Sequence, residues 1–470
     1  MKPLLFSSSV FLWLFLPLVI VANFTIKNKY SNYLLLAASL VFYAWGEPVY
    51  IALMLFSIVM NWGFGLLIDK ADKGKKLLLA LCAVGNLILL GYFKYFNFFA
   101  DSINKLVGGQ WIAGRDIALP IGISFFTFQA LSYVIDLYRG DCKVQKNILN
   151  LALYVSFFPQ LIAGPIVRYS DIDEQIHSRS VSTQKFALGL RRFLYGLGKK
   201  IILSNCMAEL ADTIFAVPFA QLTTVSAWLG AIAYTMQIYY DFSGYSDMAI
   251  GLGWIFGFDF LENFNYPYLS RSIREFWQRW HISLGTWFRE YVYIPLGGNR
   301  KGKFRTYINL LVVFFLTGMW HGASWTFVAW GLFHGAFQII ERLGFNRFLK
   351  KHNVLGHIYC LFVVVFGWVF FRLESLTDGI RYILRMIAPW RYGFGDMFKL
   401  PDMLNLRNGL FLLLAIVGCG VIQSIGKKLP KLTTKWKYGY VEMGFLMLVF
   451  AYCMILLAAG TYNPFIYFRF

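Results

Sequence analysis

The 470-residue chain is 58% hydrophobic and 19% aromatic, and only 14% of its residues are charged. A soluble domain has about one quarter charged residues, so this composition excludes an ordinary soluble protein and indicates a polytopic membrane protein. The formal charge of +20 would suit a nucleic-acid ligand in a soluble protein. Cytoplasmic loops of membrane proteins accumulate Lys and Arg, however, and no basic low-complexity tail is present, so we expect no nucleic acid.

Apolar segments follow one another along nearly the whole chain. A membrane-spanning helix needs about 20 mostly apolar residues, and several segments are shorter or are interrupted by Pro and Gly. We therefore predict an all-α polytopic membrane protein with about eleven transmembrane helices plus re-entrant and interfacial helices, in one domain over residues 1–470. The candidate segments are 4–24, 31–46, 49–68, 77–99, 117–138, 148–166, 186–206, 225–240, 245–260, 306–320, 323–341, 356–371, 409–426 and 440–459.

Loop charges predict the orientation of these helices. Loops 25–30, 69–76 and 139–147 are basic, which places them in the cytoplasm and the N-terminus outside it. A further basic loop at 427–437 precedes the last apolar segment. The C-terminal tail, residues 460–470, is therefore also expected on the extracytoplasmic face.

Two segments before residue 260 interrupt the apolar pattern. FFPQLIAGPIVR, residues 157–168, contains Pro and Gly and predicts a broken or re-entrant segment. YYDFSGYSDMAIG, residues 239–251, contains Asp241 and Asp247 between two apolar segments. These acids mark a cavity, a helix cap or a turn that breaks the helix, and an ion relay is the alternative.

The segment 270–300 has a helical period, with His281 on the same stripe as Trp277, Leu284 and Phe288. A basic aromatic helix commonly lies at a membrane interface. Because His281 is on the apolar stripe, we favour a helix buried in the protein, with His281 facing a cavity. The neighbouring arginines are typical of a cytoplasmic loop, and guanidinium groups also bind phosphate oxygens in pairs. The candidates for binding a coenzyme are Arg274, Arg279 and Arg289.

The stretch MWHGASW places His321 in a long run without Asp, Glu, Lys or Arg. A neutral imidazole can take a proton from a hydroxyl that attacks an acyl group, and a structural histidine bonded to Thr317 or Ser324 is the simpler interpretation. His334 is interpreted as structural. The sequence has no HxxxH or HExxH spacing, so we expect no metal site.

The chain ends in NPFIYFRF, which contains Tyr467. An aromatic anchor at the membrane interface is the simplest interpretation of this tail. A phenol in an apolar site can also act as a nucleophile when a base is nearby.

Four of these segments together resemble the membrane-bound O-acyltransferase family: FFPQLIAGPI, DFSGYSDMAIG, FWQRWHISLGTWFREYVYIPLGGNR and MWHGASWTFVAWGLFHG. They are most similar to its bacterial cell-envelope branch, which includes alginate O-acetyltransferase membrane subunits. The resemblance implies that His321 is the catalytic histidine and that His281 occupies the second active-site position. It also implies a ring of helices around a central tunnel, which acetyl-CoA enters from the cytoplasm.

The resemblance further implies that Tyr467 lies in a tail motif whose tyrosine receives the acyl group and presents it outside. The expected partner is a membrane-anchored SGNH-hydrolase-like acetyltransferase that passes the group to a polysaccharide. The expected location is the bacterial inner membrane, in contact with its lipid. Two alternatives stay open: a transporter with an Asp and His relay, and an acyltransferase that acts on a lipid or a small molecule.

Overall fold

The computed structural model describes residues 4–393, 404–422, 424, 439–460 and 462–466. Within these residues the secondary structure is helical, as the composition predicts, with one isolated antiparallel bridge between Phe264 and Trp280. The chain divides into two compact units. The first unit contains residues 1–193 and 246–261, and the second contains 194–245 and 262–470.

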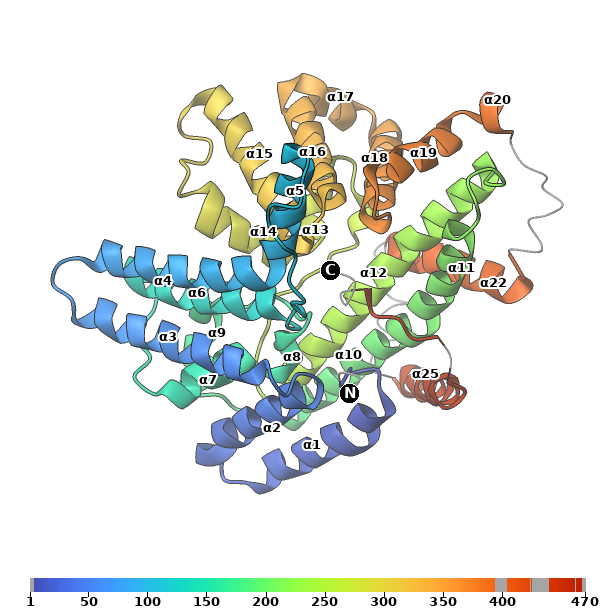
Figure 1. Ribbon diagram of the computed structural model, residues 1–470. Coiled ribbons are helices and arrows are strands. Elements are labelled where there is room, and N and C mark those ends of the chain that lie inside the picture. The colour runs from blue at the N-terminus through green and yellow to red at the C-terminus, as the bar shows by residue number, and fades with distance from the viewer. Residues whose placement is uncertain (1–3, 394–403, 423, 425–438, 461, 467–470) are drawn as a thin grey trace. The chain divides into compact units, whose positions relative to one another are not determined.

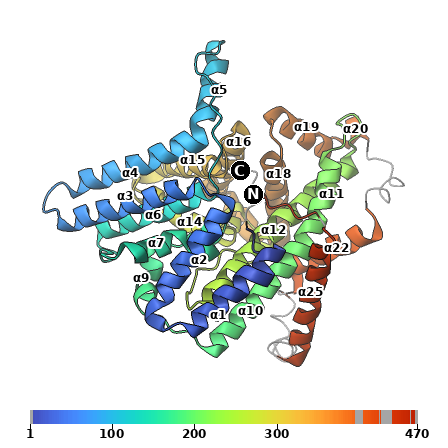
Figure 2. The same cartoon turned by 60° about the horizontal axis from the view of Figure 1, so that its bottom comes forward.

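The first unit is a stack of helices in which α3, α4 and α6 pack against one another and α2 packs against α7 (Figure 1). Two buried asparagines pair between α3 and α4: Asn61 donates to Asn86 at 3.1 Å, and Asn86 donates back at 3.0 Å. Such reciprocal bonds join helices in apolar surroundings, where an amide without a partner is costly. Figure 2 shows α5 extending away from the other helices of this unit. The helices are α1 (Leu16–Thr25), α2 (Ser31–Gly46), α3 (Ile51–Lys70), α4 (Lys75–Leu90), α5 (Phe96–Val107), α6 (Ile123–Arg139), α7 (Ile148–Ser156), α8 (Phe158–Leu161) and α9 (Tyr169–His177).

The second unit is built around the hairpin of α15 and α16, with α18 packed against α16 (Figure 1). Helices α10 (Thr183–Gly198) and α12 (Thr224–Ile255) contribute residues to both units. The other elements of the second unit are η4 (Lys199–Ser204), α11 (Asn205–Phe215), α13 (Ile273–Arg279), α14 (Ile282–Phe288), η6 (Arg289–Tyr293), α15 (Gly302–His321), α16 (Trp325–Ile340), η7 (Glu341–Phe345), α17 (Asn346–Lys351), α18 (Asn353–Arg372), α19 (Leu376–Ile387), α20 (Pro389–Tyr392), α22 (Leu406–Ile416), η9 (Val417–Val421) and α25 (Tyr440–Ala458).

Four helices in the described ranges are long and apolar enough to cross a membrane. They span Ile51–Lys70, Lys75–Val107, Asn353–Arg372 and Tyr440–Ala458. The chain is therefore a membrane protein by the length and composition of these helices, while the figure of about eleven spans stays a prediction. The segment 148–166 is broken as predicted, because α7 ends before Phe157 and the short helix α8 begins at Phe158 with Pro159 in its first turn.

The prediction of a break near Asp241 and Asp247 is wrong, because α12 runs unbroken through both residues. Each carboxylate is neutralised within its own unit. Asp241 pairs with Lys200 at 2.5 Å, and Asp247 pairs with Arg192 at 2.9 Å. The two charges are accommodated in a helix because each has a cation beside it.

The prediction of one continuous helix through 270–300 is also wrong. Helix α13 ends at Arg279, Trp280 is extended, and His281 has a positive φ of 47°. The cause is pairing with a preceding segment: the Asn265 amide donates to the Arg279 carbonyl at 2.9 Å, and the Ile282 amide donates to the Asn263 carbonyl at 3.0 Å. These bonds replace the helical ones at the break, so the backbone polar groups stay satisfied.

Candidate active site

The hairpin of α15 and α16 places His321 at the last residue of α15. Ser324 then caps α16 by accepting the amide of Thr326 at 3.2 Å. The two helices approach closely through glycine, since a Cβ at Gly331 would lie 2.2 Å from the Phe314 carbonyl oxygen. A similar Cβ at Gly318 would lie 2.3 Å from the carbonyl oxygen of Phe327. The sequence around His321 therefore encodes a tight turn between close-packed helices.

His321 is 5% exposed and lies among aromatic rings. Its ring centroid is 5.0 Å from those of Trp320 and Trp330 and 5.1 Å from that of Phe371. The carbonyl end of a helix favours a positive charge, which is the charge that an imidazole gains when it accepts a proton. This placement suits a base that is shielded from bulk water.

His281 is fully buried and is oriented by Asn263. The Asn263 Oδ1 atom accepts hydrogen bonds from the amide and hydroxyl of Ser283, at 3.2 and 2.9 Å. Because this oxygen is an acceptor, the His281 Nδ1 atom at 3.1 Å must carry the proton and donate it. The His281 Nε2 atom is then a buried acceptor, with no hydrogen-bond partner among the described residues.

Burial lowers the pKa of His281 to about 3, so its imidazole is neutral near pH 7. The ring centroids of His281 and His321 are 6.4 Å apart, and Trp320 contacts both rings. The structure therefore brings together the two histidines that the sequence singled out. It places them as neighbours in one aromatic pocket, 40 residues apart in the chain.

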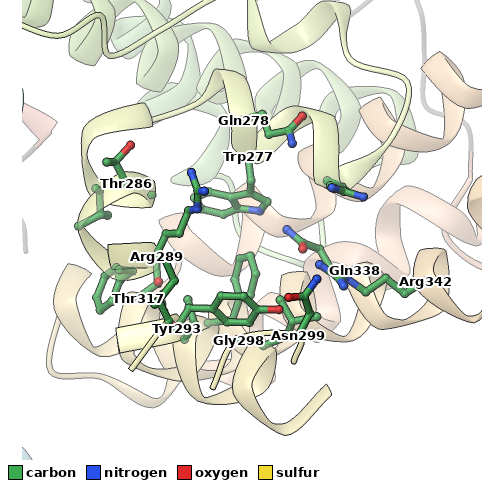
Figure 3. Close-up of a pocket in the computed structure, with 18 of the residues that line it drawn as sticks. Trp277, Gln278, Thr286, Arg289, Tyr293, Gly298, Asn299, Thr317, Gln338 and Arg342 are labelled. Atoms are coloured by element: carbon green, nitrogen blue, oxygen red, sulfur yellow. Dashed lines mark hydrogen bonds between the residues drawn. The ribbon is translucent and has the colours of Figure 1, made fainter. Parts of the chain in front are cut away.

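A basic cavity of about 700 Å³ lies beside this pair (Figure 3). Part of its wall is the start of α13, which buried Glu341 holds in place. The Glu341 carboxylate accepts hydrogen bonds from the amides of Ile273 and Arg274 at 2.5 and 3.1 Å. Asn309 holds the facing loop by donating to the Gly298 carbonyl at 2.9 Å. The cationic and amide side chains in the lining belong to Arg274, Gln278, Arg289, Asn299, Arg300, Gln338 and Arg342.

Two of the three arginines proposed from the sequence, Arg274 and Arg289, line this cavity. Arg279 is not in its lining; its guanidinium pairs with Glu275 at 2.9 Å and donates to the Asn265 carbonyl at 3.2 Å. Figure 3 shows Arg289 and Arg342 on opposite sides of the cavity. Guanidinium groups facing one another in this way suit a ligand that carries several phosphates.

A second cavity, of about 660 Å³, begins at the turn directly after His321. Its lining includes the turn 322–324 and residues 371–374, which are the last two residues of α18 and the two that follow it. Thr317, one helical turn before His321, lines the basic cavity instead. In the sequence, His321 therefore lies between a residue that lines one cavity and a residue that lines the other.

The C-terminal segment reaches the same place. Phe465 and Ile466 are buried, and Ile466 lines a small cavity of about 10 Å³ together with His321, Trp280 and Trp368. The described part of the tail is thus an inserted segment rather than a free one. Tyr467 lies outside the described residues, as do the three residues that follow it.

The amino-acid sequence matches known proteins over its middle and over nearly its whole length. A family model described as MBOAT, membrane-bound O-acyltransferase family, matches residues 143–379, which is half of the chain. The chain is 41% identical to a probable alginate O-acetylase of Azotobacter vinelandii over 99% of this chain and all of that protein. The chain belongs to the membrane-bound O-acyltransferase family. As a member of this family it is an O-acyltransferase.

Two other relatives of this membrane-bound O-acyltransferase are informative. It is 45% identical to a probable alginate O-acetylase of Pseudomonas aeruginosa, over 88% of this chain and 80% of the relative. It is 36% identical to a peptidoglycan O-acetyltransferase of Helicobacter pylori, over 82% of this chain and 80% of the relative. The segment matched by the family model contains both histidines and the whole lining of the basic cavity.

Sequence reasoning missed several features of the site in this membrane-bound O-acyltransferase. Arg342 lies in a different part of the sequence from the arginine cluster at 270–305, so proximity in sequence could not find it. Asn263 was missed because an amide in a loop carries no distinctive signal.

His334 is fully buried between Trp277 and Trp330, and it lines none of the three cavities described above. The described residues contain no cluster of three groups that could hold a metal.

Proposed function

We propose that this enzyme transfers an acetyl group from cytosolic acetyl-CoA to a polysaccharide outside the cytoplasm. The observation that carries this proposal is that Thr317, one helical turn before His321, lines the basic cavity, while Gly322, directly after His321, lines a second cavity. A base whose neighbours in the chain line two cavities can serve a donor bound in one and an acceptor bound in the other.

The basic cavity is the proposed donor site. Its facing arginines supply bidentate hydrogen bonds for the phosphates of the coenzyme. Its volume of about 700 Å³ falls in the usual range for a small-molecule site, about 300–1,000 Å³. Since cytoplasmic surfaces of membrane proteins are rich in Arg and Lys, this cavity is assigned to the cytoplasmic side, and both termini to the outer side.

His321 acts as the general base in this proposal. The acceptor hydroxyl attacks the thioester carbon, and its proton passes to the His321 imidazole. The carbon–sulfur bond then breaks, and the coenzyme thiolate takes the proton from the imidazolium. His281, neutral and held by Asn263, offers its Nε2 atom as a hydrogen-bond acceptor to another N–H or O–H donor of the bound substrate, because the single proton of the attacking hydroxyl goes to His321.

Tyr467 is the proposed first acceptor. Its support is the preceding residue, since Ile466 lines the small cavity beside His321. A tyrosyl ester formed there would then be passed to an acetyltransferase partner outside the cytoplasm, of the SGNH-hydrolase-like class. The names of the relatives, alginate O-acetylase and peptidoglycan O-acetyltransferase, support a cell-envelope polysaccharide as the final acceptor and the bacterial inner membrane as the location.

The test uses inverted membrane vesicles that contain the protein and its proposed partner. Labelled acetyl-CoA is added outside, and the label is measured separately in polysaccharide, lipid and small-molecule fractions. We expect label in the polysaccharide with the wild type and none with His321→Ala. Label in the lipid or small-molecule fraction instead would reassign the acceptor. Uptake of an intact solute without cleavage of the thioester would favour a transporter.

A further inference from the structure

A buried ion pair on η4 and α12 has no part in the chemistry described above. Lys200 and Asp241 are each 1% exposed, and their charged atoms are 2.5 Å apart. Removing two charges from water costs more than their mutual attraction returns, unless the pair makes further hydrogen bonds. Charged groups at such positions in membrane proteins usually have a function. The other hydrogen bonds of Lys200 and Asp241 indicate which segment of the chain the pair acts on.

Both members of the pair also bind the C-terminal segment. The Lys200 ammonium donates to the Pro464 carbonyl, and the Asp241 carboxylate accepts the Ile466 amide at 2.7 Å. Between these two bonds, the Phe465 ring packs 4.9 Å from the Tyr245 ring. The same Phe465 ring lies 5.7 Å from the Lys200 ammonium. The ion pair therefore binds the tail backbone on both sides of Phe465, whose side chain is itself packed against Tyr245. This set of contacts is called the grip on residues 464–466.

Local structure brings the two partners together. Lys200 lies in a π-helical segment, η4, a rare form that is often found at functional sites. One turn after Asp241, Gly244 lets α12 approach this segment, since a Cβ there would lie 3.1 Å from the Lys200 backbone nitrogen. The fold thus brings a lysine and an aspartate into contact where the tail inserts.

The contacts continue back along the tail. The Asn205 side chain donates to the Asn463 side chain at 3.2 Å, and the Tyr462 hydroxyl donates to Asp212 at 2.8 Å. The chain from Tyr462 to Ile466 is thus held by hydrogen bonds at four of its five residues and by ring contacts at the remaining one, Phe465. Because this segment cannot slip by one residue without breaking these bonds, its register is fixed.

We propose that Lys200 and Asp241 are positioning residues that set the register of the C-terminal segment beside His321. The pair sets which residue of the tail comes directly after the one that lines the small cavity beside His321. It thereby sets which hydroxyl can accept the acyl group. This inference rests on the proposed role of Tyr467 for its consequence in catalysis. The grip on residues 464–466 itself does not depend on that role.

The test uses the full-length protein with Ile466→Cys as a reporter, since Ile466 is 2% exposed. Modification of this thiol by N-ethylmaleimide is followed on the C-terminal peptide by mass spectrometry. Acetyl label on Tyr467 from labelled acetyl-CoA is followed in the same protein without the reporter. The main variant is Lys200→Met with Asp241→Leu, which removes both charges and leaves neither buried alone.

We expect the main variant to react with the reagent at least tenfold faster and to lose at least nine tenths of the tail label. A matched control is Arg192→Met with Asp247→Leu, which removes the other ion pair of α12. The control should keep the protection of the thiol and the label. Equal protection in the main variant and the wild type would overturn the proposal.

A charge exchange, Lys200→Asp with Asp241→Lys, keeps the ion pair but reverses its donors and acceptors. The lysine at 241 cannot accept the Ile466 amide, so we expect exposure of the thiol with normal folded yield. Full protection in this variant would show an ion pair that only supports the fold. If the thiol behaves as predicted but Tyr467 is never labelled, the grip stands and the acceptor assignment fails. If Tyr467 is labelled equally in all variants, the acceptor stands and the positioning role is overturned.

Discussion

The two histidines reach the same aromatic pocket by different routes. His321 ends a regular helix in a hairpin whose close packing is visible in its glycines. His281 lies at a break with a positive φ, between α13 and α14, and is held by Asn263 from an irregular segment. Apart from glycine, the described residues contain one other positive φ, at Tyr266 in that same irregular region. Backbone strain at an active site is a sign that the position is fixed by its surroundings. In the proposed mechanism, the hairpin supplies the reactive group and the irregular segment supplies a fixed orienting group.

The largest effect is expected at the hairpin. His321→Ala should lower acetyl transfer by about 10²–10⁴-fold, because a general base contributes that much. The folded yield and the binding of acetyl-CoA should stay at wild-type levels. Transfer from labelled acetyl-CoA measures the effect, with His357→Ala as a control on a histidine outside the pocket. Transfer within threefold of wild type would remove His321 from the mechanism.

The irregular segment should show a smaller effect. Asn263→Ala leaves His281 and Ser283 without their shared acceptor, which costs about 1–3 kcal/mol. We expect transfer to fall about 10- to 100-fold. The KM for acetyl-CoA should change little, since Asn263 does not line the basic cavity. A rise in KM with unchanged kcat would contradict the orienting role.

The packing of the hairpin can be tested separately from its chemistry. Gly331→Ala puts a Cβ against the Phe314 carbonyl oxygen, which should destabilise the protein by about 1–3 kcal/mol. Gly444→Ala on α25 is the control, because a Cβ there meets nothing within 4 Å. Thermal unfolding in detergent compares the two. Equal stability of both variants would show that α15 and α16 can move apart at Gly331 without a loss of stability.

The basic cavity offers a comparison between two arginines. Arg342→Gln removes a cation from its lining, so the KM for acetyl-CoA should rise about 10- to 150-fold, which corresponds to the loss of one charged hydrogen bond of about 1.5–3 kcal/mol. Arg279→Gln removes a guanidinium that pairs with Glu275 outside the cavity, and KM should change less than about twofold. Steady-state kinetics decides between them. The reverse order of effects would place the coenzyme elsewhere.

The buried state of His281 predicts a dependence of stability on pH. Burial lowers its pKa to about 3 from an ordinary value of about 6.5, so the unfolded chain binds the proton more readily between these values. Its contribution to stability is complete above about pH 6.5 and is lost as pH falls toward 3. Wild type should therefore lose up to about 1.4 kcal/mol per pH unit more than His281→Asn in this range. Parallel curves for the two proteins would show that His281 is solvated.

The sequence predicted the hairpin well but not the break at His281. The apolar segments 306–320 and 323–341 match α15 and α16 closely, because long uncharged runs with helical length leave few alternatives. The periodic side chains of 270–300 continue through the break, so periodicity alone favoured one helix. The break is imposed by pairing with residues 263–265, a contact that no local pattern encodes.

The same limit applies to charged groups. Asp241 and Asp247 suggested a break or a relay because their partners, Lys200 and Arg192, are not adjacent to them in sequence. Arg342 was missed for the same reason. The two candidate histidines could be singled out from residue types in apolar surroundings, whereas Tyr467 was singled out only by the resemblance to a family. Their partners depend on contacts between segments distant in the chain.

The most direct test of the central claim is acetyl transfer to the purified protein in detergent from isotopically labelled acetyl-CoA. Wild type, His321→Ala and Tyr467→Phe are compared, and any label is mapped by peptide mass spectrometry. The account predicts label on Tyr467 in the wild type and its loss in both variants. Label on another residue, or label on Tyr467 that persists in His321→Ala, would contradict a relay from His321 to the tail.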